Sequence, residues 1–247
     1  MTDRATTTPT NSPVDGVDQS PEFRKFKIFP GLEAHRFVPV DLAKEYAVRE
    51  AANDYGDIDM KNPGMQQLFV ETASGHHMSY GGFFEDRTRL WTGFEPDMAR
   101  MVHLGVDINM LDPGQSVTAP DTCVVCHVMR DPTKFNGWGG RVLLRLRDDR
   151  HHKYPFLLLG HLDSRKYLPN LGEELEKGQL IGVIGSFEWN GGWFPHLHIQ
   201  QMSEKYVMGF EDPSRIDGYA ENAENMTEGM VTDPCDLIAE RGDFLPF

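Results

Sequence analysis

Short apolar segments, each bounded by Gly, Pro, Asp or Asn, follow one another along the chain from about Gln67 onward. Segments of this length that are rich in aliphatic or β-branched residues are typical of β-strands. The pattern therefore predicts a mainly β protein, with a hairpin where Asp148–Lys153 joins two neighbouring segments. The predicted strands are Met65–Ala73, Ser116–Met129, Arg141–Arg147, Tyr154–Leu162 and Gln179–Ser186.

The N-terminal part has a different pattern. Asp41 can cap a helix over Leu42–Ala52, because Leu42, Glu45, Tyr46 and Arg49 recur at helical spacing and Gly56 follows as a stop. Residues 1–22 are rich in Thr, Pro, Ser and Asp without a hydrophobic period, which predicts a disordered tail.

Three further stretches are interpreted from their turn residues. Asn62-Pro63-Gly64 predicts a turn, and Leu171–Gly178 predicts one turn of helix before a tight bend. Residues 211–230 are polar and acidic and predict a long loop, after which Asp233–Ile238 caps the fold.

Composition narrows the class of protein. The 247 residues are 39% hydrophobic and include 15 Phe, enough for a sizeable core, and the formal net charge of −14 argues against nucleic acid or an anionic membrane as a partner. No apolar run approaches the ~18 residues of a membrane span, and Met1–Ser20 lacks the basic start and apolar stretch of a secretory signal. We therefore expect a cytoplasmic protein whose partner is a small molecule or a peptide.

Chemistry-bearing residues concentrate in the segment Phe194–Gln200. On an extended strand His196, His198 and Gln200 share one face, while Leu197 and Ile199 share the other. The two imidazoles would sit ~6.5–7 Å apart at their backbone positions, so one could hold a metal while the other reaches an atom bound to it. The alternative is a pair of surface histidines on an ordinary strand.

A second candidate is His103-Leu104-Gly105-Val106-Asp107. On a straight strand His103 and Asp107 would lie ~13 Å apart, whereas two ligands of one zinc ion lie only ~3–3.5 Å from each other. Gly105, Val106 and Ile108 are poor helix formers, so a shared ion requires a bend before the strand, which Gly105 can supply. The alternative is an isolated polar pair at a strand start.

The third candidate, His161, closes the very apolar run Leu157-Leu158-Leu159-Gly160. A histidine there can be a capped core residue. It can also be a neutral imidazole held by packing, as a proton donor or base beside zinc must be.

These pieces occur in a specific order. His103–Asp107 reads His-x-Gly-x-Asp, Gly160–Leu162 reads Gly-His-Leu, Gly178–Gly185 reads Gly-Gln-x-Ile-Gly-x-x-Gly, and Pro195–His198 reads Pro-His-Leu-His. With Val117–Pro120 and Gly139–Val142 between them, the order resembles the lysostaphin/LytM-type zinc metallopeptidases over roughly residues 100–205. The stretch Tyr80–Leu90 resembles the lead-in of an intracellular branch of that family.

The resemblance implies antiparallel sheets around an open groove, the duplicated-hybrid-motif type of fold, here with a short helical N-terminal extension. It implies zinc bound by His103, Asp107 and His198, with His161 and His196 as unliganded catalytic histidines. Three protein ligands leave a fourth position for water, whose pKa zinc lowers to ~7 to give a hydroxide nucleophile. The parts of the chain are then a tail (1–22), an N-terminal extension packing on the core (23–95), the zinc-enzyme core (96–210) and a C-terminal loop and capping segment (211–247).

One loop departs from the family pattern. The family has a small, Ser/Thr/Gly-rich loop before Pro-His-Leu-His, whereas this chain has Phe187–Phe194, which contains Trp189 and Trp193. Bulky side chains would shorten the groove into a pocket, with Trp193 lining it, and pockets suit small ligands. We therefore expect a zinc hydrolase acting on a peptide or a small, anionic, amide-bearing molecule and not on peptidoglycan. The alternatives are a zinc lyase acting on a polar metabolite, an ordinary cell-wall endopeptidase, and a binding module, although all five expected site positions are filled.

Glu85, Arg87 and Arg89 alternate along a predicted strand within Tyr80–Leu90. They could form a substrate-binding clamp for a carboxylate at the groove edge, because Arg holds carboxylates bidentately. The alternative is a solvated salt-bridge face, which we expect for at least one of the arginines.

Cys123-Val124-Val125-Cys126-His127 has the spacing of a covalent haem attachment motif. It also fits a core strand with Cys123, Val125 and His127 on one face, which we favour. A second zinc site at Cys123 and Cys126 would lack another ligand pair nearby in sequence.

Overall fold

The structure is a computed structural model that describes residues 23–52, 62–90, 101–109, 112–131, 137–220, 226 and 229–241. The predicted tail, residues 1–22, and the predicted helix stop at Gly56 lie outside the described residues.

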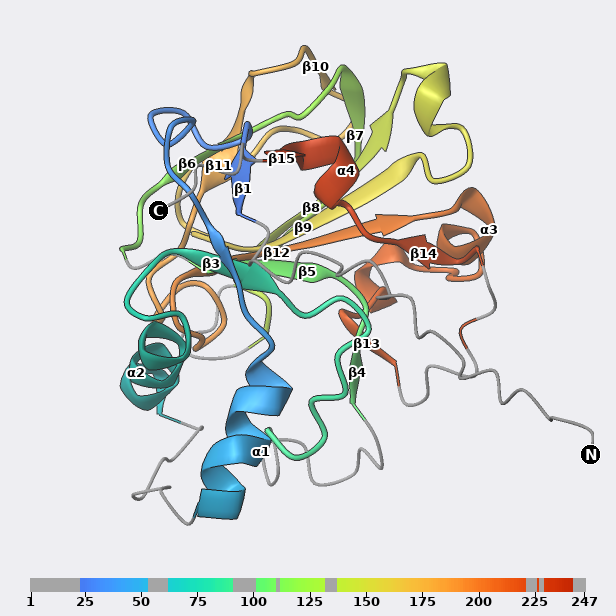
Figure 1. The fold of residues 1–247 in the computed structure, drawn as a ribbon. Helices are drawn as coiled ribbons and strands as arrows, with labels where there is room; N and C mark the ends of the chain where they lie inside the picture. Colours follow the sequence, from blue (N-terminus) through green and yellow to red (C-terminus); the bar gives the residue numbers. More distant parts are fainter. Residues whose placement is uncertain are drawn as a thin grey trace, which may run out of the picture.

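A nine-stranded sheet organises the described part of the chain (Figure 1). Neighbouring strands are antiparallel except β2 and β3, and β14 (Val231–Thr232) pairs with one end of β12. The mainly β, antiparallel prediction is confirmed. The order of the other strands is β10 (Glu174–Leu175), β7 (Cys123–Arg130), β8 (Gly140–Leu146), β9 (Phe156–Leu162), β12 (His196–Met202), β5 (Val106–Asn109), β3 (Ser79–Gly81) and β2 (Val38–Pro39).

Smaller elements complete the fold. The two-stranded sheets are β1 (Arg24–Phe26) with β15 (Ala239–Arg241), β6 (Ser116–Thr118) with β11 (Leu180–Val183), and β4 (Val102–His103) with β13 (Tyr219–Ala220). The helices are α1 (Leu42–Ala52), α2 (Pro63–Ala73), α3 (Glu204–Val207) and α4 (Cys235–Ile238), with 3₁₀ turns at Asp149–His151 and Pro213–Arg215.

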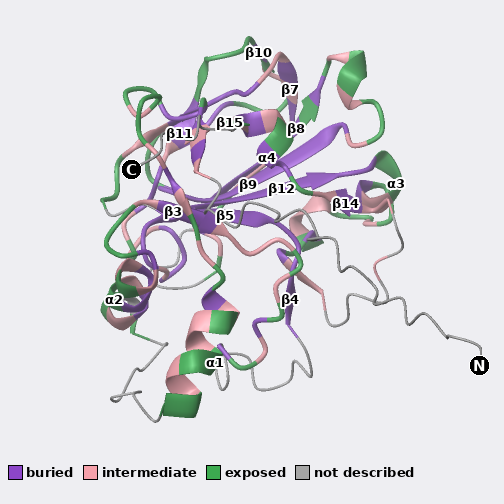
Figure 2. Cartoon of the chain, in the orientation of Figure 1, coloured by how far each residue is buried: buried purple, intermediate pink, exposed green. Residues whose placement is uncertain are grey.

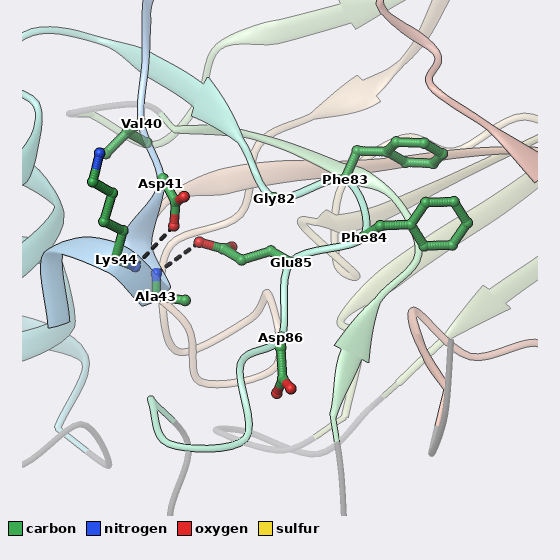
Figure 3. Close-up of a pocket in the computed structure, with 9 residues that line it drawn as sticks. All are labelled: Val40, Asp41, Ala43, Lys44, Gly82, Phe83, Phe84, Glu85 and Asp86. Atoms are coloured by element: carbon green, nitrogen blue, oxygen red, sulfur yellow. Dashed lines mark hydrogen bonds between the residues drawn. The ribbon is translucent and has the colours of Figure 1, made fainter. Parts of the chain in front are cut away.

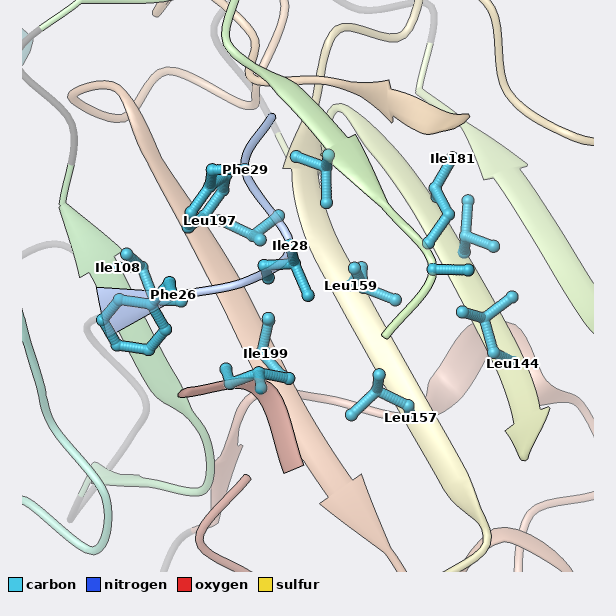
Figure 4. Packing of buried hydrophobic residues seen from close by; sticks show 14 of the residues in the cluster. Phe26, Ile28, Phe29, Ile108, Leu144, Leu157, Leu159, Ile181, Leu197 and Ile199 are labelled. Carbon is cyan, nitrogen blue, oxygen red and sulfur yellow. The ribbon is translucent and has the colours of Figure 1, made fainter. Parts of the chain in front are cut away.

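The two central strands, β9 and β12, are buried on both faces (Figure 2). On one face Leu157, Leu159, Leu197 and Ile199 join the main hydrophobic core, which Phe26 covers from the N-terminal segment (Figure 4). On the other face Leu143, Leu158 and Met202 form a second cluster. Burying one such side chain contributes about 1.5–3 kcal/mol, so β12 is held rigidly from both sides.

The predicted helix over Leu42–Ala52 and the hairpin of β8 and β9 are both confirmed. The Asp41 side chain accepts a hydrogen bond from the Lys44 amide at 2.8 Å, as expected of a helix cap. α1 and α2 lie together on one side of the main sheet (Figure 1).

The predicted strand Met65–Ala73 is wrong, because these residues form helix α2. The Asn62 side chain accepts from the Gly64 amide at 2.9 Å, and Pro63 occupies the first turn, so the predicted turn is instead a helix start. Gln66, Phe69 and Val70 are buried at helical spacing. The consecutive apolar residues Leu68, Phe69 and Val70 concealed this period.

Other predicted elements changed in detail. The segment Ser116–Met129 is two strands, β6 and β7, because Ala119–Thr122 breaks it. Leu171–Gly178 contains strand β10 between turns and no helix. The N-terminal extension contributes β2 and β3 to the main sheet itself. No helix in the described residues is both long and apolar enough to cross a bilayer.

Candidate metal centre

Strands β12 and β5 are adjacent and antiparallel, and they place His198 directly opposite Asp107. Gln200, His198 and His196 point to one face of β12 while Leu197 and Ile199 lie in the core behind it, as the alternation predicted. A packed apolar face therefore fixes the polar face.

His103 reaches the same point by a bend at Gly105, between β4 and β5. The predicted bend is confirmed. Glycine is needed there because a side chain would have no room, and not because the backbone adopts an unusual φ angle. A Cβ at Gly105 would lie 2.7 Å from both Cε1 and Nε2 of His198 and would also meet the Ile199 carbonyl. Only glycine lets the chain pass this close to the imidazole.

Three donor atoms converge as a result. His103 Nε2 lies 2.9 Å from His198 Nδ1 and 3.3 Å from Asp107 Oδ1, and His198 Nδ1 lies 3.2 Å from the same oxygen. These separations match the ~3–3.5 Å expected between ligands of one zinc ion. In the described part of the chain this is the one group of three or more His, Cys, Asp or Glu residues arranged to hold a metal.

The outer nitrogens of both histidines are occupied. His103 Nδ1 lies 2.9 Å from the Gly82 carbonyl oxygen, and His198 Nε2 lies 3.3 Å from Gln200 Oε1. Both oxygens can accept a hydrogen bond from these outer nitrogens. In the tautomers that do so, lone pairs face inward on His103 Nε2 and His198 Nδ1, as metal binding requires. Two lone pairs and a carboxylate oxygen then surround one point, an arrangement that a cation stabilises.

His161 and His196 stand beside these three residues. Their rings are 4.3 Å apart, and His196 Nε2 lies 3.9 Å from Asp107 Oδ1. His161 Nδ1 donates to the Asn190 carbonyl and His196 Nδ1 to the Phe194 carbonyl, each at 2.7 Å. Each ring therefore keeps an unprotonated Nε2 with which to take up a proton.

A β-bulge aims His161. Gly140 pairs with Leu162 but Val142 pairs with Leu159, so β9 carries an extra residue at this point. His161 takes φ +65°, a left-handed conformation that costs a non-glycine residue about 1–3 kcal/mol. Bulges beside active sites commonly redirect a side chain, and no local sequence pattern revealed this one.

The electrostatics keep three of these imidazoles, those of His103, His161 and His196, neutral. Burial, reinforced by the Arg87 guanidinium, lowers the pKa of His103 to about 4. Burial, reinforced by His196, lowers the pKa of His161 well below its usual value, and burial lowers that of His196 as well. Burial alone would raise the pKa of Asp107, but His103 and Arg87 outweigh it and hold that pKa well below its ordinary value.

Lowering the pH should therefore destabilise the metal-free protein. In the unfolded chain each of these histidines takes up a proton below about pH 6.5, whereas in the folded state His103, His161 and His196 stay neutral to lower pH. The unfolded state then binds more protons, so the free energy of unfolding falls as the pH drops below about 6.5, by at most about 1.4 kcal/mol per pH unit and group. For His103 the loss continues toward its folded pKa of about 4.

Urea unfolding of the metal-free protein at about pH 7.5 and about pH 5.5 measures this loss. The midpoint should be lower at the acidic pH, and His161→Asn should reduce the difference. An equal or higher midpoint at the acidic pH would contradict the prediction.

Aromatic rings surround the histidines. Trp138 stacks on His161 with ring centroids 5.2 Å apart and planes inclined by 12°, and Trp193 lies 6.0 Å from the same ring. Tyr219 of β13 lies 5.2 Å from His103. Of these rings, Trp193 was predicted from the sequence, whereas Trp138 and Tyr219 were not. Trp138 directly precedes Gly139–Val142, a stretch that resembles the family pattern, and this position could have indicated that it lies near the site.

The predicted strand around Glu85 is wrong, because residues 82–90 form turns with one bridge between Asp86 and Val102. Arg89 forms an ion pair of 2.5 Å with Glu50 at the surface, which confirms the salt-bridge expectation for one arginine. Arg87 is buried between Glu85 and Asp107. Substrate binding by Glu85, Arg87, Arg89 and Trp193 stays a prediction.

The cysteine motif forms part of strand β7. Cys123 and Val125 lie in the main core, as expected. A bulge between Val125 and His127 places His127 opposite Leu143, whose side chain packs on the other face of the sheet, so the shared face predicted for His127 is wrong. Burial raises the pKa of Cys123 to about 12, which disfavours the thiolate needed to bind a metal.

Comparisons with known proteins gave partial matches. No protein-family model and no curated protein matches the sequence. The catalytic domain of the antimicrobial peptidase lysostaphin from Staphylococcus simulans aligns at 25% identity over 55% of this chain and 77% of that domain, with a TM-score of 0.36.

Longer proteins are matched over a smaller share of their length. The alignment with another lysostaphin structure spans 43% of that protein, at 22% identity and a TM-score of 0.35 over 55% of this chain. A zinc-containing peptidase from Vibrio cholerae aligns at 25% identity over 44% of this chain and 30% of its own, with a TM-score of 0.33. Over roughly half of its length, this chain is similar to lysostaphin and to a zinc-containing peptidase.

Proposed function

We propose that this chain is a lysostaphin/LytM-type zinc hydrolase that cleaves an amide bond in a peptide or a small amide-bearing molecule other than peptidoglycan. The convergence of His103 Nε2, Asp107 Oδ1 and His198 Nδ1 within 3.3 Å of one another carries the proposal. Two imidazoles and one carboxylate are a donor set typical of catalytic zinc, which keeps a further position open. The same three residues lie in His103–Asp107 and Pro195–His198, two of the motifs that resemble this family.

Zinc, when bound, would supply a Lewis acid and a water of lowered pKa. The chain's own part in the reaction is proton transfer and positioning. Nε2 of His161 or His196 can take a proton from the attacking water and return it to the leaving amine, because Nδ1 of each ring is tied to a carbonyl. A protonated imidazole beside the carbonyl oxygen of the substrate would also stabilise the charge that develops there.

The enclosure of the site supports a slender or small substrate. His103, Asp107, His161, His196 and His198 are all at most 7% exposed. Segment 214–219 lies against the site on one side: the Leu104 amide donates to the Gly218 carbonyl at 2.8 Å, and a Cβ at Gly218 would lie 3.0 Å from His198 Cε1. Buried Arg141 holds this segment by donating to the carbonyls of Ser214 and Ile216. The net charge of −14 also opposes approach to an anionic cell-wall polymer.

A substrate screen tests the proposal. Zinc-loaded protein should release no soluble fragments from purified peptidoglycan, and it should cleave members of a panel of short peptides and N-acyl amino acids. For hydrolysis, the product masses add up to the mass of the substrate plus one water. The Asp107→Asn protein, which lacks one metal ligand, is the matched control.

Two outcomes would redirect the proposal. Rapid release of muropeptides would replace it with a cell-wall endopeptidase. Products whose masses add up to that of the substrate alone would make the enzyme a lyase.

A further inference from the structure

A chain of buried charges lies directly behind the metal centre. Arg87 Nε donates to Glu85 Oε2 and Arg87 Nη1 donates to Asp107 Oδ2, both at 2.5 Å. The side chains of Glu85, Arg87 and Asp107 are only 7%, 3% and 4% exposed. A buried ion pair of this kind is a weak source of stability, because desolvation offsets the attraction, so its presence invites a functional explanation.

The two oxygens of Asp107 are divided between two partners. Oδ1 faces His103 Nε2 at 3.3 Å and His198 Nδ1 at 3.2 Å, on the side of the predicted metal. Oδ2 faces away and is held by Arg87. This hydrogen bond fixes the rotation of the carboxylate about its terminal bond, and it leaves Oδ1 alone on the metal side.

Arg87 is itself held from behind. Glu85 Oε1 accepts from the Ala43 amide at 2.7 Å, in the first turn of α1 (Figure 3). The helix N-terminus therefore anchors the carboxylate that holds Arg87. Gly82 makes room in front, since a Cβ there would lie 2.8 Å from His103 Nδ1 and would overlap Arg87 Nη2. The charges alternate from Glu85 to Arg87 to Asp107. Glu85 therefore offsets the positive charge of Arg87, which orients the Asp107 carboxylate without adding a net positive charge next to the metal.

We propose that Arg87, held by Glu85, which is in turn bound to the N-terminus of α1, is a positioning residue that restricts Asp107 to ligation through one oxygen. The proposal rests on the metal site of the proposed function. With Oδ2 withheld, the protein offers three donor atoms, which suits tetrahedral zinc with one open position. Larger or harder divalent ions favour more oxygen ligands and take carboxylates through both oxygens. Arg87 therefore favours zinc over ions such as Mn²⁺.

The ratio of two dissociation constants tests this role. Metal-free Arg87→Met protein is titrated with Zn²⁺ and with Mn²⁺ against a competing fluorescent chelator. Loss of the guanidinium charge acts equally on both ions, because both are divalent, and so cancels in the ratio. The preference for zinc, measured as the Mn²⁺ Kd divided by the Zn²⁺ Kd, should fall by up to about tenfold, because losing the hydrogen-bond partner of a ligand typically changes metal affinity by about tenfold or more.

A second variant keeps the test decisive if Arg87→Met protein does not fold. Arg87→Met leaves Glu85 buried without its partner, so Glu85→Gln/Arg87→Met removes both charges and should show the same fall in the ratio. Arg145→Met, which breaks a half-exposed pair with Glu204, is the control and should leave the ratio unchanged.

The outcomes separate the two proposals. If the Arg87 variants change the Kd values of both ions by the same factor, Arg87 has only a structural role and this inference is overturned while the metal site stands. If the unmodified protein does not bind zinc, the proposed function fails together with the inference.

Discussion

Alanine at His198 should leave the purified protein without zinc, whereas we expect the unmodified protein to carry about one ion per chain. The ion would depend on three donor atoms held within 3.3 Å of one another, and two donors do not retain it against dialysis. His103→Ala should have the same effect. For Asp107 we choose Asn, because its amide oxygen can still accept the hydrogen bond of buried Arg87, whereas alanine would leave that guanidinium nitrogen without an acceptor.

Elemental analysis of the dialysed proteins measures the loss. His35→Ala, which changes an exposed histidine, is the control and should keep its zinc. Circular dichroism should show that each variant is folded, since β12 keeps its apolar face in the core. Full zinc content in the His198→Ala protein would show that the ligand assignment is wrong.

His161→Ala and His196→Ala should keep the zinc and lose turnover by about 10²–10⁴-fold, the usual contribution of general acid–base catalysis. Neither imidazole belongs to the convergent group of ligand atoms, and each keeps an Nε2 available next to it. Because the two rings lie 4.3 Å apart, we expect the effects to be less than additive in the double variant.

The measurement pairs zinc content with kcat on the substrate that the screen identifies. His152→Ala, in the exposed turn between β8 and β9, serves as the control for loss of an imidazole as such. Loss of zinc in both the His161 and His196 variants would make these residues ligands, and the proposed mechanism would then fail.

Local sequence patterns determined the elements that depend on near neighbours. The alternation of Pro195–Gln200 placed His196 and His198 on one face of a strand, and Asp41 before a helical period marked the start of α1. Bond lengths at zinc showed that His103 and Asp107 need a bend between them, and the chain bends at Gly105. The same reasoning failed for α2, where three consecutive apolar residues obscured the helical period.

Tertiary structure alone decided which distant groups meet. Asp107 lies opposite His198 because β5 pairs with β12 across 91 residues of chain, and Trp138 reaches His161 through a loop that no periodicity describes. The bulge that turns His161 toward the site depends on the register between β8 and β9. Register is fixed by packing of both strands in the core and leaves little trace in either strand alone.

Arg87 shows most clearly what could not be predicted from the sequence. Its sequence neighbours Glu85 and Arg89 indicated an exposed, alternating strand, and the expected partner was a substrate carboxylate. In the fold, Arg87 is buried and its partners are the carboxylates of Glu85 and Asp107, of which Asp107 also belongs to the candidate metal centre. The sequence by itself determined which residue types could bind a carboxylate and a metal. Only the tertiary structure decided that Arg87 binds Asp107, a candidate metal ligand. The physical reason is that a charge is buried in a protein interior only where the fold places an opposite charge beside it.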